Sequence, residues 1–393
     1  MKKTFAILMA LTLVLSSFGF MSVSAATTPW DGVTADIKWY LDNIDADTFT
    51  ISNANEWAGL VEIVATYNAD EGEVKKDPNF GISTKLYYDE NGLVVTDASK
   101  QSETRVLTKT DENFPVTNFK GKTVKLAADI DLAGKSIKPL GYPKNFEGTL
   151  DGQNHTVKNL NTSAFCAKAM FNGDRYVYGA LIYVAVSSTV VKNIKVENAV
   201  LDLTVNQTVA TPASQKRLFC GGLAGYTNGR CTFENVTVNG LTVTINATDL
   251  ATQRVLWGVM TSVLFSAQEE DMYIFKNITV TGYTLNNPNN YPVASVVSID
   301  EEKTAITDLT STDRLFGMNA GALPSQVTFE NVNVTYGAYV PTTPETQAPT
   351  TQAPAASDST VVPPEGDSVV AIVALAAVAA TGILFVSRKR KED

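Results

Sequence analysis

The sequence is poor in histidine and in basic residues. His155 is the single histidine among 393 residues, so neither a His-rich metal site nor a Ser-His-Asp triad with alternative members can be argued, and we interpret His155 as a turn or packing residue. No pair of cysteines has the spacing of a zinc site. Acidic residues outnumber basic ones by 41 to 31, and the formal net charge is −10. Because an acidic chain repels phosphate backbones, we expect no nucleic-acid partner.

Cysteine is equally scarce. Cys166, Cys220 and Cys231 are too few, and odd in number, for the disulfide framework of a small extracellular domain. A bridge between Cys220 and Cys231 would close a hairpin-sized loop. The alternative, which we favour, is that these residues are buried thiols in a packed interior.

The N-terminus has the pattern of an export signal. Lys2 and Lys3 precede an apolar run over 5–15, and small residues follow up to Ala25. This order is typical of a secretory signal peptide, which we assign to residues 1–26 and exclude from the fold. An uncleaved anchor helix is the alternative, but the apolar run is short for a bilayer span.

The C-terminus has the pattern of a membrane anchor. Residues 368–387 carry no charge, and a basic cluster opens the tail 388–393. A helix of roughly 20 apolar residues spans a bilayer, with basic residues on the cytoplasmic side. Residues 341–367 are rich in Thr, Pro, Gln, Ala and Ser, which predicts an extended spacer. We therefore expect the rest of the chain to face outward.

A proline-containing motif directly precedes this anchor. Its position before an apolar helix and a basic tail resembles the LPXTG-type sorting signal, which sortase transpeptidases cut between Thr and Gly to attach a chain to the cell wall. Here an acid stands in the Thr position and Val362 in that of Leu. Sortase attachment and an uncleaved membrane anchor therefore remain equal alternatives. The motif consists of Pro363, Pro364, Glu365, Gly366 and Asp367.

A short motif recurs through the middle of the chain, in which Asn is followed by an aliphatic residue and, two positions later, by Val. Alternating apolar positions predict strands buried on one face. Intervals of about 42 residues indicate two solenoid coils of about 20 residues per copy. The copies lie at Asn193, Asn235, Asn277 and Asn331, with a weaker first copy at Asn159.

Asparagine suits a fixed corner of such a coil. It tolerates the left-handed conformation of a tight turn, and its amide can bond to the asparagine stacked above it. Evenly spaced strands also describe an antiparallel sandwich. We favour the stacked parallel helix, because sandwich strands do not require the same residue at the same corner.

Two further motifs carry a family resemblance. Gly221, Gly222, Leu223 and Gly225 resemble the GLUG motif of bacterial cell-surface proteins of the Gram-positive type. Residues 146–160 are similar to the coil that opens such domains. The resemblance covers most of 30–336 and implies an all-β fold, a right-handed parallel β-helix (solenoid) of the pectate-lyase-like kind, which we place at 119–340. It bears on fold and location rather than on activity.

Residues 27–118 are expected to form an N-terminal cap on this solenoid. Asn53 and Glu56 make a capping pair for an amphipathic helix, which can cover the open end of a solenoid core. In the inserted segment, strands over 85–88 and 93–96 flank an Asn-Gly turn, which predicts a protruding hairpin. The apolar face of the helix consists of Trp57, Leu60, Val61 and Val64.

Carboxylates are the candidates for chemistry, since parallel β-helices include polysaccharide lyases and glycosidases. Turn chemistry and solubility account for every cluster, so we expect no catalytic residue. Hard oxygens suit calcium, so calcium at Asp129, Asp131 or Asp151 is an alternative. Because no calcium-binding loop occurs, we favour the absence of a metal site and of a cofactor. The clusters are Asp129 with Asp131, Asp151, and Glu269 with Glu270 and Asp271.

These patterns together predict a cell-surface-anchored, non-catalytic β-helix protein of the adhesin type. Its expected partners are host or neighbouring-cell glycans or proteins, a sortase, and the membrane through the C-terminal helix. A polysaccharide lyase or glycoside hydrolase of the pectate-lyase-like fold is one alternative. A passive structural spacer is the other.

Overall fold

The computed structural model describes residues 27–66, 85–108, 118–142, 145–165, 167–168, 175–186, 188–202, 217–244, 255–265, 272–286, 293–294, 316–320 and 324–336. All of them belong to the first of two compact units, Met1–Pro341. The predicted signal peptide, the spacer, the sorting-like motif 363–367 and the apolar stretch 368–387 lie outside the described residues. Within the described part, no helix has the length and apolar character that a membrane crossing requires.

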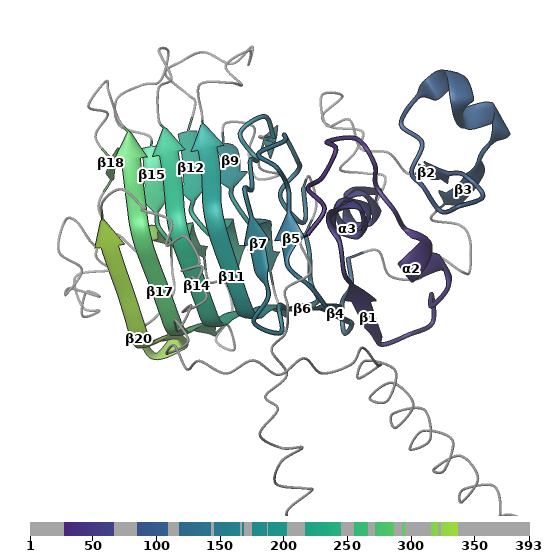
Figure 1. Ribbon diagram of the computed structural model, residues 1–393. Coiled ribbons are helices and arrows are strands. Elements are labelled where there is room, and N and C mark those ends of the chain that lie inside the picture. The colour runs from purple at the N-terminus through teal and green to yellow at the C-terminus, as the bar shows by residue number, and fades with distance from the viewer. Residues whose placement is uncertain are drawn as a thin grey trace, which may run out of the picture. The chain divides into compact units, whose positions relative to one another are not determined.

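Most of the described residues form β-strands, with few helices (Figure 1). The elements are α2 (Lys38–Leu41), β1 (Thr48–Ile51), α3 (Ala54–Thr66), β2 (Lys85–Tyr88), η1 (Ala98–Glu103), β3 (Arg105–Thr108), β4 (Thr123–Leu126), β5 (Ile130–Asp131), β6 (Thr149–Asp151), β7 (Thr156–Lys158), β8 (Ala167–Lys168), β9 (Arg175–Gly179), β10 (Ile182–Val186), β11 (Thr189–Asp202), β12 (Arg217–Gly221), β13 (Ala224–Asn228), β14 (Cys231–Thr244), β15 (Val255–Gly258), β16 (Thr261–Phe265), β17 (Tyr273–Asn286), β18 (Val293–Ala294), β19 (Phe316–Ala320), η3 (Pro324–Gln326) and β20 (Val327–Tyr336).

Three sheets contain nearly all of these strands. A nine-stranded sheet runs β1-β4-β6-β11-β14-β17-β20 with β5 and β7 beside it, a four-stranded sheet runs β10-β13-β16-β19, and a five-stranded sheet runs β18-β15-β12-β9-β8. Among the described pairs in these sheets, only β8 with β9 is antiparallel. The chain visits the sheets in a fixed order, since β9, β10 and β11 are followed by equivalent triplets. This all-β arrangement of parallel strands is compatible with a parallel β-helix. It does not fit an antiparallel sandwich.

The repeat interval is one coil, not two. β11 pairs directly with β14, and β14 with β17, along their whole lengths. Stacked asparagines in these strands are 42 residues apart. The prediction of two coils of about 20 residues per copy was therefore wrong. From β9 onward each pass crosses all three sheets, and in the pass β12–β14 the longest strand alone has 14 residues, so one such pass consumes the full interval.

The core follows the predicted alternation of buried and outward positions. In β14 every second side chain is buried on each side of a corner. The Phe233 and Phe275 rings stack with centroids 5.5 Å apart, and Phe329 continues the stack at 5.5 Å. Such rows of like side chains pack between successive passes. If one pass shifted its register against its neighbours, every row would be broken at once.

The interior also holds the two cysteines for which we considered a bridge. Cys220 and Cys231 are buried thiols, as favoured above, and burial raises the pKa of Cys231 far above its usual range. Cys166 lies outside the described residues.

Helix α3 has the predicted cap and the predicted buried face. The Glu56 amide donates to Asn53 Oδ1 at 3.0 Å, and Glu56 Oε2 accepts from the Ser52 amide at 2.5 Å. The first bond satisfies a donor that a helix start leaves open, and the second ties the chain before the cap to the first turn. The buried side chains include Trp57, Leu60, Val61 and Val64, and α3 contacts β5 at one end of the largest sheet.

The inserted hairpin differs in part from its prediction. β2 forms where expected and ends in a turn in which the Gly92 amide donates to the Asp89 carbonyl at 3.1 Å. Its full-length antiparallel partner, however, is β3. Residues 93–96 form isolated bridges in place of a strand: Val94 pairs with Tyr88, as the predicted hairpin requires, and Leu93 pairs with Asp36. The insertion is therefore paired through its backbone with the chain before α2 and does not protrude freely.

Candidate functional site

The four repeat asparagines form one ladder. Each has a left-handed backbone, with φ of 51° at Asn193, 54° at Asn235, 53° at Asn277 and 54° at Asn331. The side-chain amides of Asn235, Asn277 and Asn331 each donate to the Oδ1 of the preceding asparagine, at 2.9, 2.8 and 2.9 Å. The structure thus brings these predicted residues together. What they share is a corner that needs positive φ and stacked amide bonds, which is a structural task.

A second corner lies five positions further along β11, β14 and β17. Asn159, Asn198, Gly240 and Gly282 all have positive φ there. Asn198 Nδ2 donates to Asn159 Oδ1 at 3.4 Å, so Asn159 belongs to this second corner. The prediction that Asn159 is a weaker copy of the first corner was therefore wrong. The signal that could have revealed this row was an Asn or Gly five positions after Asn193, Asn235 and Asn277.

Each of the two rows of corner side chains ends at one of the predicted carboxylates. Asp151 Oδ1 accepts from Asn193 Nδ2 at 3.0 Å, and Asp131 Oδ1 accepts from Asn159 Nδ2 at 2.7 Å. Lys192 lies 3.6 Å from Asp151. Burial alone would raise the pKa of Asp151, but the bonds from Asn193 and the Gln153 amide, with Lys192, outweigh it and hold the pKa below its ordinary value.

Asp131 is held in the same way. Burial alone would raise its pKa, but the Asn159 amide, the Ala133 N–H and nearby Lys158 lower it on balance. A carboxylate with a lowered pKa holds no proton at neutral pH and is unsuited to act as a general acid. Both residues are already engaged as acceptors for the corners.

Asp129 is the remaining described carboxylate of these clusters. Its Oδ1 accepts from the Thr156 amide at 2.9 Å and lies 3.3 Å from His155 Nδ1. Both side chains are one-third exposed, so Asp129 and His155 form a candidate acid–base pair. Glu269, Glu270 and Asp271 lie outside the described residues. No three His, Cys, Asp or Glu side chains are grouped for a metal ion in the described part of the chain.

Charges of alternating sign form a row beside the asparagine ladder. Cross-strand register places Lys125 next to Asp151, Asp151 next to Lys192, and so on outward across six strands. At the far end Lys276 Nζ lies 3.1 Å from Glu330. Opposite charges on adjacent strands favour this register. If a strand paired with the next strand but one, like charges would lie side by side. The row is Lys125, Asp151, Lys192, Glu234, Lys276 and Glu330.

The GLUG-like residues lie where β12 passes into β13. A Cβ on Gly221 would overlap the Ala224 carbonyl, and one on Gly222 would overlap the Val259 carbonyl of the next pass. Leu223 is buried in the core. A Cβ on Gly225 would approach Val177 Cγ1 at 2.6 Å. This motif is therefore required by close backbone packing between successive passes.

A groove lies between α2 and the inserted hairpin, and we call it the hairpin groove. It has a volume of about 580 Å³. One wall carries Lys38, Leu41, Asp42 and Ile44, and the other consists of the turn 88–92 and residues 105–107 of β3. Sequence reasoning missed this site, because no spacing in the sequence brings these three segments together.

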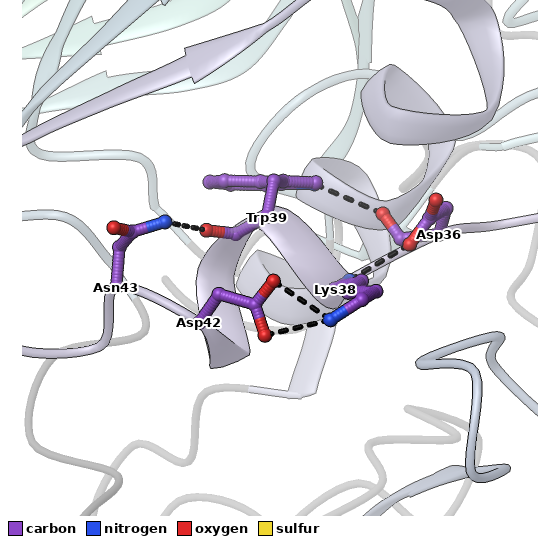
Figure 2. A network of polar contacts seen from close by, with 5 residues as sticks. All are labelled: Asp36, Lys38, Trp39, Asp42 and Asn43. Carbon is purple, nitrogen blue, oxygen red and sulfur yellow. Dashed lines mark hydrogen bonds and ion pairs between the residues drawn. The ribbon is translucent and has the colours of Figure 1, made fainter.

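Polar contacts fix the α2 wall (Figure 2). Lys38 Nζ donates to both Asp42 carboxylate oxygens at 2.8 and 2.7 Å. The Lys38 amide donates to Asp36 Oδ1 at 2.7 Å, and Trp39 Nε1 donates to the Asp36 carbonyl at 2.9 Å. The Trp39 ring also packs edge-on against Phe49, at 5.6 Å between centroids. The short helix thus keeps its aromatic side in the core and its Lys–Asp pair toward the groove.

No family model matches the chain, and comparisons with curated proteins and with solved structures also find no match.

Proposed function

We propose that this chain is an exported, cell-surface-anchored protein whose body is a right-handed parallel β-helix capped by α3. Support comes from the three parallel sheets, which the chain visits in a fixed order, and from the asparagine corners repeated on β11, β14, β17 and β20. The GLUG-like resemblance and the signal- and anchor-like ends support location at a Gram-positive-type surface. The fate of the Glu365–Gly366 bond, cut by a sortase or left intact, decides between wall and membrane attachment.

We further propose that the body binds glycans or proteins of a host or neighbouring cell without cleaving them. The observation that argues against cleavage is that Asp131 and Asp151 accept hydrogen bonds from Asn159 and Asn193, at 2.7 and 3.0 Å, and so are engaged in the corners. Outward positions of β14 and β17 present hydroxyl and amide groups, and the Thr281 hydroxyl donates to Asn239 Oδ1 at 2.7 Å. Rows of such groups are chemically suited to hydroxyl-rich ligands.

The test is a glycan and extracellular-matrix array probed with the purified chain, with and without calcium. Retention of a defined set of ligands supports the proposal. Retention of none would favour a passive spacer, and calcium-dependent retention would add a cofactor that we do not expect.

One observation favours a second candidate, a polysaccharide-cleaving enzyme. Asp129 and His155 are 3.3 Å apart and partly exposed, as an acid–base pair would be. If the chain cleaves a polysaccharide through this pair, Asp129→Asn abolishes cleavage while the protein remains folded. Cleavage that survives Asp129→Asn would assign the activity elsewhere.

A further inference from the structure

We propose that the hairpin groove binds neutral sugar residues of a surface glycan. This inference rests on the proposed function and names both the site and the ligand class. It is carried by three features of the groove, which are its fixed walls, its uncommitted polar groups and its charge.

Backbone bonds hold the two walls in place before any ligand arrives. The Ile37 amide donates to the Gly92 carbonyl at 2.9 Å, and the Val94 amide donates to the Ala35 carbonyl at 2.8 Å. Gly92 has φ of 81°, and a Cβ there would approach Lys38 Cβ at 2.8 Å. The hairpin turn and α2 are therefore in direct contact, and a ligand pays little ordering entropy for the protein side of the site.

Some of the charged side chains that line the groove are already bonded within the protein, and others form no ion pair with a described residue. Lys38 is committed to Asp42, and Asp89 Oδ1 accepts from the Asn91 and Leu93 amides at 2.9 Å each. Arg105 and Glu90, by contrast, form no ion pair with any described residue.

Arg105 and Glu90 point to a ligand that donates and accepts hydrogen bonds at once. Arg105 only donates, through its five N–H groups, and ionised Glu90 only accepts. Sugar hydroxyls do both, and the apolar side chains of Leu41 and Ile44 in the opposite wall suit the C–H face of a sugar ring. The volume of about 580 Å³ falls in the usual range of small-ligand sites, roughly 300–1,000 Å³.

Charge selects against acidic glycans. Asp42, Asp89 and Glu90 outnumber Lys38 and Arg105 in the groove, and the whole chain carries −10. A carboxylated sugar would meet net repulsion on approach and inside the site. We therefore assign the groove to uncharged hexose or N-acetylhexosamine units.

The experiment measures Kd of the purified full-length chain for immobilised neutral oligosaccharides and for matched oligosaccharides that carry carboxylates. We expect the neutral set to bind more tightly. Arg105→Ala and Glu90→Ala should each weaken binding of the best neutral ligand about tenfold, as loss of a hydrogen bond to a charged group does. Lys195→Ala is the control, because it removes an exposed cation on β11, outside the groove, and should leave Kd unchanged.

The outcomes separate this inference from the proposed function. Glycan binding that is unaffected by Arg105→Ala and Glu90→Ala would overturn the groove assignment and leave surface binding standing. Tighter binding of the carboxylated set, or groove-dependent binding of peptides instead of glycans, would overturn the ligand class. If no glycan binds at all, both proposals fall.

Discussion

Replacing Asn277 tests whether the asparagine ladder stabilises the fold. Its side chain donates to Asn235 Oδ1 at 2.8 Å and accepts from Asn331 Nδ2 at 2.9 Å. Two such bonds at a half-buried site contribute about 1–2 kcal/mol together. Alanine at φ of 53° adds a left-handed backbone cost of about 1–2 kcal/mol. We expect Asn277→Ala to lower the free energy of unfolding by about 2–4 kcal/mol, and Asn277→Gly by about 1–2 kcal/mol, because glycine avoids the backbone cost.

The assay is urea unfolding followed by far-UV circular dichroism. The control is Asn333→Ala, which removes an exposed asparagine of β20 that is not a rung of the ladder and should change stability by less than about 0.5 kcal/mol. If Asn277→Ala is no more destabilising than this control, the ladder does not stabilise the fold. If alanine and glycine have equal effects, the left-handed corner carries no strain for a Cβ and that part of the reasoning is wrong.

Three other perturbations follow from the same corners and core. Lys276→Glu would place three carboxylates in a row with Glu234 and Glu330. We expect the free energy of unfolding in urea to fall by about 1 kcal/mol at low salt and by less in concentrated salt. A loss that does not depend on salt would contradict the charge row. The pKa of Asp151 is lowered in the folded state, so its contribution to stability is complete above the ordinary pKa and is lost as pH falls through the lowered folded value. Asp151→Asn should therefore flatten the acid limb of stability against pH below about 4, and an unchanged limb would contradict this. The buried thiol of Cys231 should react with a thiol reagent only on unfolding, and rapid labelling of the native protein would refute its burial.

Local patterns in the sequence predicted the repeating parts of the fold. The corner at Asn235, the alternation on both sides of it and the cap of α3 at Asn53 all depend on residues close in the chain. The coil length was mispredicted because strand spacing does not reveal how many sheets a pass crosses. The register shows that one pass crosses three.

The hairpin groove could not be predicted in the same way. Its charged residues Lys38, Glu90 and Arg105 come from segments far apart in the sequence, and their approach depends on backbone pairing of Gly92 and Leu93 with the chain before α2. That pairing has no periodic signal. The second candidate pair, Asp129 with His155, is likewise a contact between neighbouring passes, which becomes visible only once the register is known.

The central claim is that this protein binds surface polymers without cutting them. The most direct measurement is a time course of new reducing ends and unsaturated products from each polysaccharide that the chain retains. We predict retention with no product above a protein-free control. Released oligosaccharides that disappear with Asp129→Asn would contradict the claim and make the Asp129–His155 pair the active site.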